Sequence, residues 1–334
     1  MTPVLSARSP LTPALADIQL PVRDRLELVG RELRRVVAAD FPLIDEVNGH
    51  LLLMKGKMFR PTLTLLASAV AERPEPRAVT LAAVVELVHL ATLVHDDSVD
   101  HSALRRGMPT INALFSHQVS VIMGDFLYSR AVVELVRGGD LEVLGVLADA
   151  TNAMTVGEMR QLTSLDALGF TEEDYEELIR AKTASLLSAA CGIGALAGAR
   201  EHRQALARYG EALGMAFQVA DDLLDYTSDE SVTGKPCGLD LREHKVTLPL
   251  IHALRGLPAA ARREVDALFE AAAPTDAQIA LVIEIVSDRG GLDYARRRGG
   301  EYAHDADSAL GDLPDTAATA ALRDAIAYAL DRSQ

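Results

Sequence analysis

The sequence predicts an all-α fold, a single-domain bundle of roughly ten or more helices around a central cavity. Nearly every long segment repeats its apolar residues at the period of a helix. Alanine and leucine, which are strong helix formers, dominate the composition, and the two-residue alternation of a strand is scarce. No low-complexity linker divides the 334 residues, so we expect one domain over residues 21–334, preceded by a mobile arm over residues 1–20.

The predicted helices follow one another along the chain, separated by short connections. The first long one is almost wholly apolar until its acidic end, and the second begins after Pro109 and Thr110. Thr171 is a good N-cap, because acidic residues follow it in the first turn. Proline and glycine cluster where connections are needed, at residues 72–76, 137–140 and 234–238 and at Pro274. The predicted helices are Thr80–Asp100, Asn112–Arg137, Leu141–Leu162, Thr171–Ala199 and Arg203–Tyr226.

Composition excludes several classes of protein. The net charge of -15 argues against a nucleic-acid partner. The two cysteines, Cys191 and Cys237, have no metal-site spacing and are expected to be reduced thiols in a cytoplasmic protein. The N-terminal segment lacks the basic start and apolar run of a signal peptide. The stretch ASLLSAACGIGALAGA is too short and too rich in small residues to predict a membrane span, and a closely packed core helix fits it better.

Two copies of one acidic pattern are the most informative feature of the chain. In each copy carboxylates stand at positions i, i+1 and i+4, so that on a helix the first and last lie one turn apart on the same face. Two carboxylates about 4 Å apart repel by roughly 1 kcal/mol in water and about 4 kcal/mol at an effective dielectric of 20. Cations relieve such repulsion, and oxygen ligands favour Mg²⁺. The carboxylates are Asp96, Asp97 and Asp100 in the first copy, and Asp221, Asp222 and Asp225 in the second.

Basic and polar residues recur near both acidic copies. Taken one at a time, most of them are as typical of a solvated surface as of a binding site. Beside carboxylates that can hold Mg²⁺ they instead predict anion sites, because guanidinium and ammonium groups bind phosphate. His89 lies two helical turns before Asp96 on the same face. The other candidates are Lys57, Arg60, Arg105, Arg106, Lys182, Thr183, Gln218, Lys235 and Lys245.

Together these segments resemble the trans-prenyltransferase family, the head-to-tail isoprenyl diphosphate synthases or polyprenyl synthetases. The resemblance runs from Gly56 to Pro249 and more weakly beyond. ELVHLATLVHDDSVDHSALRRGMPTINALF is similar to the first aspartate-rich region of the family, and FQVADDLLDY is similar to the second. GKMFRP resembles the GKxxRP signature, and GKPCGLDLREHKVTLPLI resembles the run GKxxGxDLxEGKxTLPLI.

The resemblance implies the isoprenoid synthase fold, a homodimer without a firm membrane anchor, and Mg²⁺ as the cofactor, with three ions per active site. It implies that the six aspartates supply the metal ligands, and that Asp96, Asp100, Asp221, Lys182 and Lys235 are central to catalysis. Isopentenyl diphosphate would be bound by Lys57, Arg60, His89 and Arg106. The allylic diphosphate would be surrounded by Arg105, Lys182, Thr183, Gln218, Lys235 and Lys245.

Product length is expected to depend on the residues one turn below the first acidic motif. In short-chain members of the family this level is often blocked by an aromatic side chain, whereas here it is occupied by Val88, Ala91 and Thr92. We therefore expect an open tunnel and a long product, from hexaprenyl to decaprenyl. A deeper floor at Met123, Leu127 or Tyr128 is a second possibility, beside the simpler interpretation that those residues are ordinary core.

The chain also departs from the family pattern. Lys55 stands where a second glycine is usual, Met58 and Phe59 where a basic and an aliphatic residue are common, and His244 where glycine is usual. A short-chain synthase, a non-catalytic subunit of a heteromeric synthase, a class I terpene cyclase and a helical metal-binding scaffold remain as alternatives. Complete acidic and basic motifs argue against a non-catalytic subunit, and a second DDxxD in place of an Asn/Ser/Glu motif argues against a cyclase.

Overall fold

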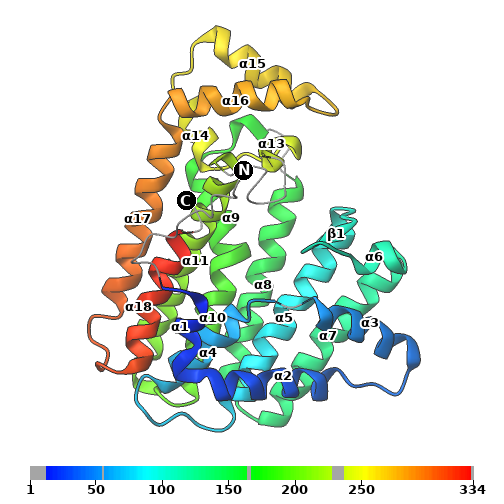
Figure 1. The fold of residues 1–334 in the computed structure, drawn as a ribbon, viewed down its shortest axis with the longest axis vertical. Helices are drawn as coiled ribbons and strands as arrows, with labels where there is room; N and C mark the ends of the chain where they lie inside the picture. The colour runs from blue at the N-terminus through cyan, green and yellow to red at the C-terminus, as the bar shows by residue number, and fades with distance from the viewer. Residues whose placement is uncertain (1–12, 55, 164–166, 228–236, 332–334) are drawn as a thin grey trace, which may run out of the picture.

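The long helices stand side by side and enclose the core, as the computed structural model shows (Figure 1). The structure describes residues 13–54, 56–163, 167–227 and 237–331. Within these residues the only strands are the two-residue β1 and β2, so the predicted all-α class is confirmed. The principal helices of the bundle are α5 (Ala78–Val99), α7 (His117–Gly138), α8 (Leu141–Thr163), α10 (Ser185–Leu196), α11 (Arg203–Thr227) and α17 (Gly291–Ala309).

The N-terminal segments close one end of the bundle. Helix α2 (Arg23–Val37) runs across the lower ends of the long helices (Figure 1). Helix α4 (Phe59–Ala69) packs against α5 and α10. The predicted arm needs a correction where it is described, because α1 (Leu15–Gln19) and the 3₁₀ turn Leu20–Val22 belong to the domain. The side chain of Ile18 is fully buried, and α1 contacts α18 (Ala317–Leu330). Burial of this apolar residue holds the segment against the bundle.

Helix α5 lies inside the bundle and ends at the first acidic motif. It is long and apolar enough to cross a membrane by length and composition alone. In this structure 67% of its most apolar window is buried against other helices, which is the environment of a core helix. The prediction of a core helix for the Gly/Ala-rich stretch also agrees with the structure, because nearly every residue of α10 is buried.

Two predicted helices are interrupted. The expected helix over residues 112–137 is split into α6 (Ile111–Leu114) and α7, because the Ser116 hydroxyl caps a new start by accepting from the Val119 amide. The expected helix over residues 171–199 begins as predicted, with Thr171 capping α9 (Glu172–Ile179). It then widens into a π-helical turn, η3 (Arg180–Ala184), before α10 begins. Such turns are frequent at functional sites.

A tight hairpin follows α5. Strand β1 (Leu104–Arg105) pairs with β2 (Met108–Pro109), and the turn between them is made by Arg106 and Gly107. Both turn residues have positive φ, 53° and 75°, as a two-residue hairpin of the common type requires. The hairpin therefore projects two consecutive arginines, Arg105 and Arg106, from one short loop.

Shorter helices cover the end of the bundle where the acidic motifs lie. Helices α13 and α14 lie beneath α15 and α16, which cross the top of the molecule (Figure 1). The 3₁₀ turns η2 and η4 and helix α3 complete the fold. Their bounds are α3 Pro42–Leu53, η2 Ala167–Gly169, η4 Arg200–His202, α13 Leu239–Arg242, α14 Leu248–Leu254, α15 Ala259–Glu270 and α16 Asp276–Asp288.

Small residues bring the central helices into backbone contact. A Cβ atom on Gly194 of α10 would lie 2.2 Å from the Thr64 carbonyl oxygen of α4. A Cβ atom on Gly214 of α11 would lie 2.5 Å from Cα of Ala184. These contacts leave no room for a side chain, so they fix the η3 turn closely against the helix that carries the second acidic motif.

Candidate active site

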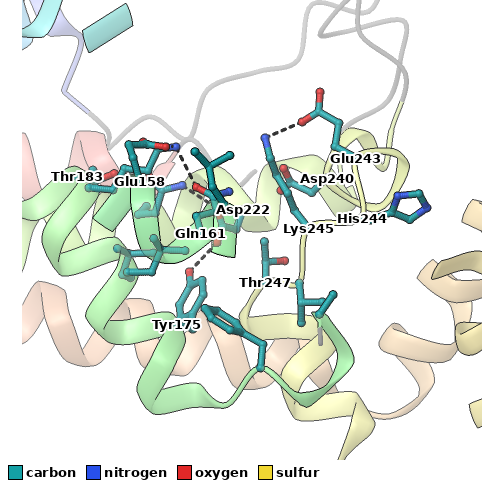
Figure 2. Close-up of a pocket in the computed structure, with 18 of the residues that line it drawn as sticks. Glu158, Gln161, Tyr175, Thr183, Asp222, Asp240, Glu243, His244, Lys245 and Thr247 are labelled. Carbon is teal, nitrogen blue, oxygen red and sulfur yellow. Dashed lines mark hydrogen bonds and ion pairs between the residues drawn. The ribbon is translucent and has the colours of Figure 1, made fainter. Parts of the chain in front are cut away.

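A cavity of about 440 Å³ opens at the acidic end of the bundle (Figure 2). Its walls come from the end of α5, the end of α8, the η3 turn, α11 and the loop after α13. Segments that are far apart in the sequence therefore meet around one space. Its charged and polar lining includes Asp100, Glu158, Gln161, Lys182, Thr183, Gln218, Asp222, Asp240, Glu243 and Lys245.

The first acidic motif occupies the last turn of α5. The Asp97 side chain is buried and accepts from Nε of Arg105 at 2.8 Å and 2.9 Å, so it already has a cationic partner. Burial raises the pKa of Asp96 to about 6, and the negative charges of Glu158 and Asp100 raise it further than Lys182 lowers it. Asp100 is exposed and lines the cavity.

Two side chains donate hydrogen bonds to the second acidic motif. Asp222 is buried on α11 and accepts from the Tyr175 hydroxyl at 2.6 Å and from Nε2 of Gln218 at 2.8 Å. Burial raises the pKa of Asp222 well above its ordinary value, and the nearby carboxylate of Asp240 adds to that rise. Asp221 is exposed at the surface of the same helix.

Asp225 joins the second motif to the loop that carries Lys245. Its two carboxylate oxygens accept from the backbone amides of Leu239 and Asp240 at 3.0 Å each. These amides lie in the first turn of α13, where a helix favours a negative charge. Burial and the charge of Asp225 raise the pKa of Asp240 to about 7. Asp225 therefore has a structural role in placing this loop over the cavity.

Two lysines face the acidic residues across the cavity. Lys182, on the π-helical turn, lies 2.6 Å from Oε1 of Glu158 and donates to Oε1 of Gln161 at 3.1 Å. Lys245 lies 2.6 Å from Oε2 of Glu243 (Figure 2). Beside Lys182, the Thr183 hydroxyl donates to Oε1 of Gln218 at 2.7 Å, so the predicted set meets here as one network.

A second basic cluster lies between α4, α5 and the hairpin. Burial lowers the pKa of Arg60 to about 10, and its Nε atom has no hydrogen-bond partner among the described residues. Burial, and then the charges of Arg60, Arg106 and Arg105, lower the pKa of His89 well below its usual value, so His89 is neutral at pH 7. Such a concentration of positive charge suits an anion.

One buried carboxylate stands inside this basic cluster. Glu86 of α5 is 4% exposed, and burial raises its pKa against the opposing effect of Arg60 and Arg106. A Cβ atom on Gly56 would lie 3.0 Å from Nη1 of Arg106 and 3.4 Å from Oε1 of Glu86. Only a glycine leaves the cluster undisturbed at this point.

Lys57 lies at the edge of the same cluster. Its Nζ atom is 5.7 Å from the centre of the Tyr328 ring on the C-terminal helix α18, a cation–π arrangement. The same ring packs on Phe59, which stacks on Phe217, with ring centres 5.7 Å and 5.9 Å apart. The unusual residue Phe59 thus belongs to an aromatic contact between α4, α11 and α18.

The structure brings together some predicted site residues more closely than others. Asp96 and Asp221 do not line the cavity, and within the described ranges no three His, Cys, Asp or Glu side chains converge as a preformed metal cluster. Lys235 and Lys55 lie outside the described residues. His244 adopts a left-handed φ of 54°, which explains why glycine is usual there, and its ring lies 5.6 Å from that of Phe269.

The residues expected to set product length lie lower on α5. Val88 and Ala91 are buried, and the Thr92 hydroxyl donates to the His89 carbonyl at 2.8 Å. Met123 and Leu127 of α7 are also buried in the core. Tyr128 is 39% exposed and its hydroxyl lies 3.4 Å from that of Thr151, so it faces the outside of α7.

Several site residues were missed in the sequence. They are Glu86, Glu158, Gln161, Tyr175, Asp240 and Glu243, which contact the predicted residues or line the cavity. Glu86 is the first letter of the ELVH segment, and Glu158 and Gln161 lie in GEMRQL. For Glu86 alone the spacing gave a signal, since it lies one helical turn before His89.

Fold and cavity define an all-α protein in which carboxylates and lysines from separate helices meet in one pocket. The family model of polyprenyl synthetases matches residues 41–286. The chain is 39% identical over 300 residues to octaprenyl diphosphate synthase of Escherichia coli K12, which covers 87% of this chain and 92% of that protein. It is 38% identical over 320 residues to a nonaprenyl diphosphate synthase of Rhodobacter capsulatus, covering 95% and 98%.

Solved structures agree with these sequence relatives. The fold matches a decaprenyl diphosphate synthase from Rhodobacter capsulatus with a TM-score of 0.91 and 35% identity, covering 96% of this chain and 100% of the other. It matches a polyprenyl synthase from Caulobacter crescentus, solved with calcium and isoprenyl diphosphate, with a TM-score of 0.89 and 32% identity, covering 98% and 99%. The chain therefore belongs to the polyprenyl synthetase family.

Proposed function

We propose that this protein is a Mg²⁺-dependent head-to-tail prenyltransferase that condenses isopentenyl diphosphate with an allylic diphosphate to make a long-chain all-trans-polyprenyl diphosphate. The observation that carries the proposal is the meeting of Asp100, Asp222, Lys182 and Lys245 in one cavity, with a separate basic cluster beside it. Two anion sites side by side are what a reaction between two diphosphates needs. Relatives named octaprenyl, nonaprenyl and decaprenyl diphosphate synthase support a long product.

The acidic side chains fit a hard divalent cation. Burial raises the pKa of Asp96 to about 6 and that of Asp240 to about 7, so a bound cation would favour their charged forms. All the donors are carboxylate oxygens, which suit Mg²⁺ better than a softer metal. Bound Mg²⁺ would supply positive charge to the leaving diphosphate. The proposed ligands are Asp96, Asp97, Asp100, Asp221, Asp222 and Asp225, of which Asp97, Asp222 and Asp225 already accept hydrogen bonds from protein groups.

Different protein groups would bind the two substrates. Lys182 and Lys245 would stabilise the negative charge that develops on the allylic diphosphate as its carbon–oxygen bond breaks. Arg60, Arg106 and Lys57 would bind the second diphosphate, and the neutral His89 can donate one hydrogen bond without adding a charge. The double bond of isopentenyl diphosphate then attacks the allylic cation, which forms the new carbon–carbon bond and leaves a tertiary cation. The departing diphosphate would take a proton from the carbon between that cation and the diphosphate-bearing carbon, and a new double bond forms there.

The growing chain is proposed to extend past Val88, Ala91 and Thr92 on α5. None of these side chains is aromatic, and Thr92 lies one turn before Asp96. A small side chain at this level leaves the path from the cavity open, which favours a long product over the farnesyl or geranylgeranyl length.

A homodimer is proposed from the outer face of α7 and α8. Large apolar side chains are exposed there, although such groups are usually buried in a monomer. Their exposed fractions are 45% for Val121, 63% for Ile122, 43% for Val156 and 56% for Met159. A cytoplasmic location with at most loose membrane association, through the apolar product, is part of the same proposal.

A product assay tests the function directly. Purified protein is incubated with Mg²⁺, labelled isopentenyl diphosphate and farnesyl diphosphate, and the dephosphorylated products are separated by length. A ladder that ends at six or more isoprene units is expected. A stop at three or four units would replace the long-chain proposal by a short-chain synthase. Folded protein that elongates nothing would point to the non-catalytic subunit of a heteromeric synthase.

A further inference from the structure

Each lysine of the cavity is paired with a glutamate. Lys182 lies 2.6 Å from Oε1 of Glu158, and Lys245 lies 2.6 Å from Oε2 of Glu243, on another wall of the cavity (Figure 2). We infer that Glu158 and Glu243 are placeholders for the allylic diphosphate: they hold the two ammonium groups over the cavity and release them when the diphosphate binds. This inference rests on the proposed function.

The two ion pairs are poorly suited to stabilising the fold. The side chains of Lys182 and Glu158 are 35% and 32% exposed, and those of Lys245 and Glu243 are 35% and 45% exposed. Ion pairs with this much access to water contribute little to stability. Other contacts already fix both segments, since Ala184 is fully buried beside Lys182 and Leu248 is buried just after Lys245. The pairs therefore need another explanation.

Lysine side chains gain most from such a partner. An ammonium group on a flexible four-carbon chain spreads over many conformations unless an acceptor holds it. Glu158, with the help of Gln161, and Glu243 supply that acceptor in the substrate-free protein. Diphosphate oxygens are anionic acceptors of the same kind, so they can take over each ammonium group without leaving it unpaired at any stage.

A placeholder has a consequence of definite sign. The carboxylate competes with the diphosphate for the same ammonium group and repels it as well, so removal of the carboxylate charge should tighten binding of the diphosphate. A residue that only supports the local structure, or that binds the substrate complex itself, would weaken binding when altered. The direction of the change thus separates the two roles.

The experiment compares Glu158→Gln and Glu243→Gln with the unaltered protein. Glutamine keeps the size of the side chain and removes its charge. The probe is farnesyl thiolodiphosphate, an unreactive analogue of the allylic substrate, titrated calorimetrically at constant Mg²⁺. Each variant is expected to lower the Kd roughly two- to fivefold, and the KM for farnesyl diphosphate should fall while the KM for isopentenyl diphosphate stays constant.

Glu177→Gln is the matched control. Glu177 of α9 forms an ion pair with Arg160 of α8, and both side chains are 60% exposed and lie outside the lining of this cavity. Its loss should leave the Kd for the analogue unchanged. Unchanged or weaker binding in both cavity variants would overturn the placeholder role alone. Failure of the unaltered protein both to bind the analogue and to elongate farnesyl diphosphate would overturn the placeholder role and the proposed function together.

Discussion

Arg105 and Asp97 form a close ion pair, with Nε of the arginine 2.8 Å from one carboxylate oxygen and 2.9 Å from the other. The pair ties the hairpin after α5 to the first acidic motif. The Asp97 side chain is 5% exposed and its charge is paired with that of Arg105, whereas Asp100 faces the cavity. The carboxylates of one short motif thus have different tasks.

Asp97→Asn should therefore affect stability more than turnover. It leaves Arg105 with a weaker partner in a buried place, which we expect to cost about 1–3 kcal/mol of unfolding free energy. Asp100→Asn should leave the melting temperature nearly unchanged and lower kcat by at least roughly a hundredfold, as losses of electrostatic stabilisation do. Thermal melts and steady-state rates on both variants check this. Loss of turnover by Asp97→Asn at an unchanged melting temperature would contradict it.

Metal-free stability should fall with rising pH because of Asp96 and Asp240. Their folded pKa values, about 6 and about 7, lie above the value near 4 of an unfolded chain. The folded state therefore binds protons more tightly, and this contribution is present at low pH and lost as the pH rises from about 4 to 7. In chelator at pH 8, Asp96→Asn should raise the melting temperature by roughly 2–5 °C. The effect should shrink at pH 5, and a lower melting temperature at pH 8 would refute the argument.

Gly194→Ala should be severely destabilising, because the new Cβ would lie 2.2 Å from the Thr64 carbonyl oxygen. Backbone atoms of α4 or α10 must move, at a cost of about 3 kcal/mol or more. Gly192, on the same helix, is the control, since its Cβ would meet only Cβ of Ala207 at 3.6 Å. Gly192→Ala should be neutral or slightly stabilising. Chemical denaturation curves measure both, and equal effects would show that α4 and α10 do not touch as described.

Glu86→Gln should weaken the binding of isopentenyl diphosphate. Glu86 is the acidic group that opposes mutual repulsion in the cluster of Arg60 and Arg106. Without the charge of Glu86 the guanidinium groups should move apart. The KM for isopentenyl diphosphate should then rise roughly fivefold or more, while the KM for the allylic substrate stays unchanged. Glu134→Gln is the control, because Glu134 is also buried and pairs with Arg35 at 2.6 Å. That variant should lose stability with both KM values unchanged; an equal KM rise would mark a general structural effect.

Thr92→Phe should shorten the product. The residue is half-buried on α5, one turn before Asp96, where an aromatic ring would stand across the proposed path of the growing chain. The product ladder is expected to end at three or four isoprene units, with the rate of the first condensation nearly unchanged. An unaltered ladder from a folded variant would place the path on another side of α5.

Much of the fold followed from residue patterns. The helices of the acidic motifs end within two residues of their predicted limits, and Thr171 caps α9 as expected. The π-helical turn did not, because RAKTA has the composition of an ordinary helix, and its close contacts with Gly157 and Gly214 come from distant segments. The helix in the described part of the predicted N-terminal arm was missed because its burial depends on one apolar residue, Ile18.

The site was predicted less evenly. Charged residues in repeated motifs stood out, and Lys182, Thr183 and Gln218 do meet in one network with Asp222. Their partners were not predicted, since Glu158 and Tyr175 come from other segments and no local spacing links them to the motifs. Contacts between distant segments depend on tertiary packing, which periodicity and composition do not encode.

The hairpin turn at Arg106 directly connects the two proposed substrate sites. Its neighbour Arg105 reaches the acidic end of α5, while Arg106 donates to the Met54 carbonyl and stands beside Gly56 at the other site. Arg105 ends strand β1 and Arg106 begins the turn, so the two guanidinium groups are linked through a single peptide unit. We therefore expect occupation of one proposed site to affect the other over a few bonds, so that the order in which substrates arrive and leave can be set without any domain movement.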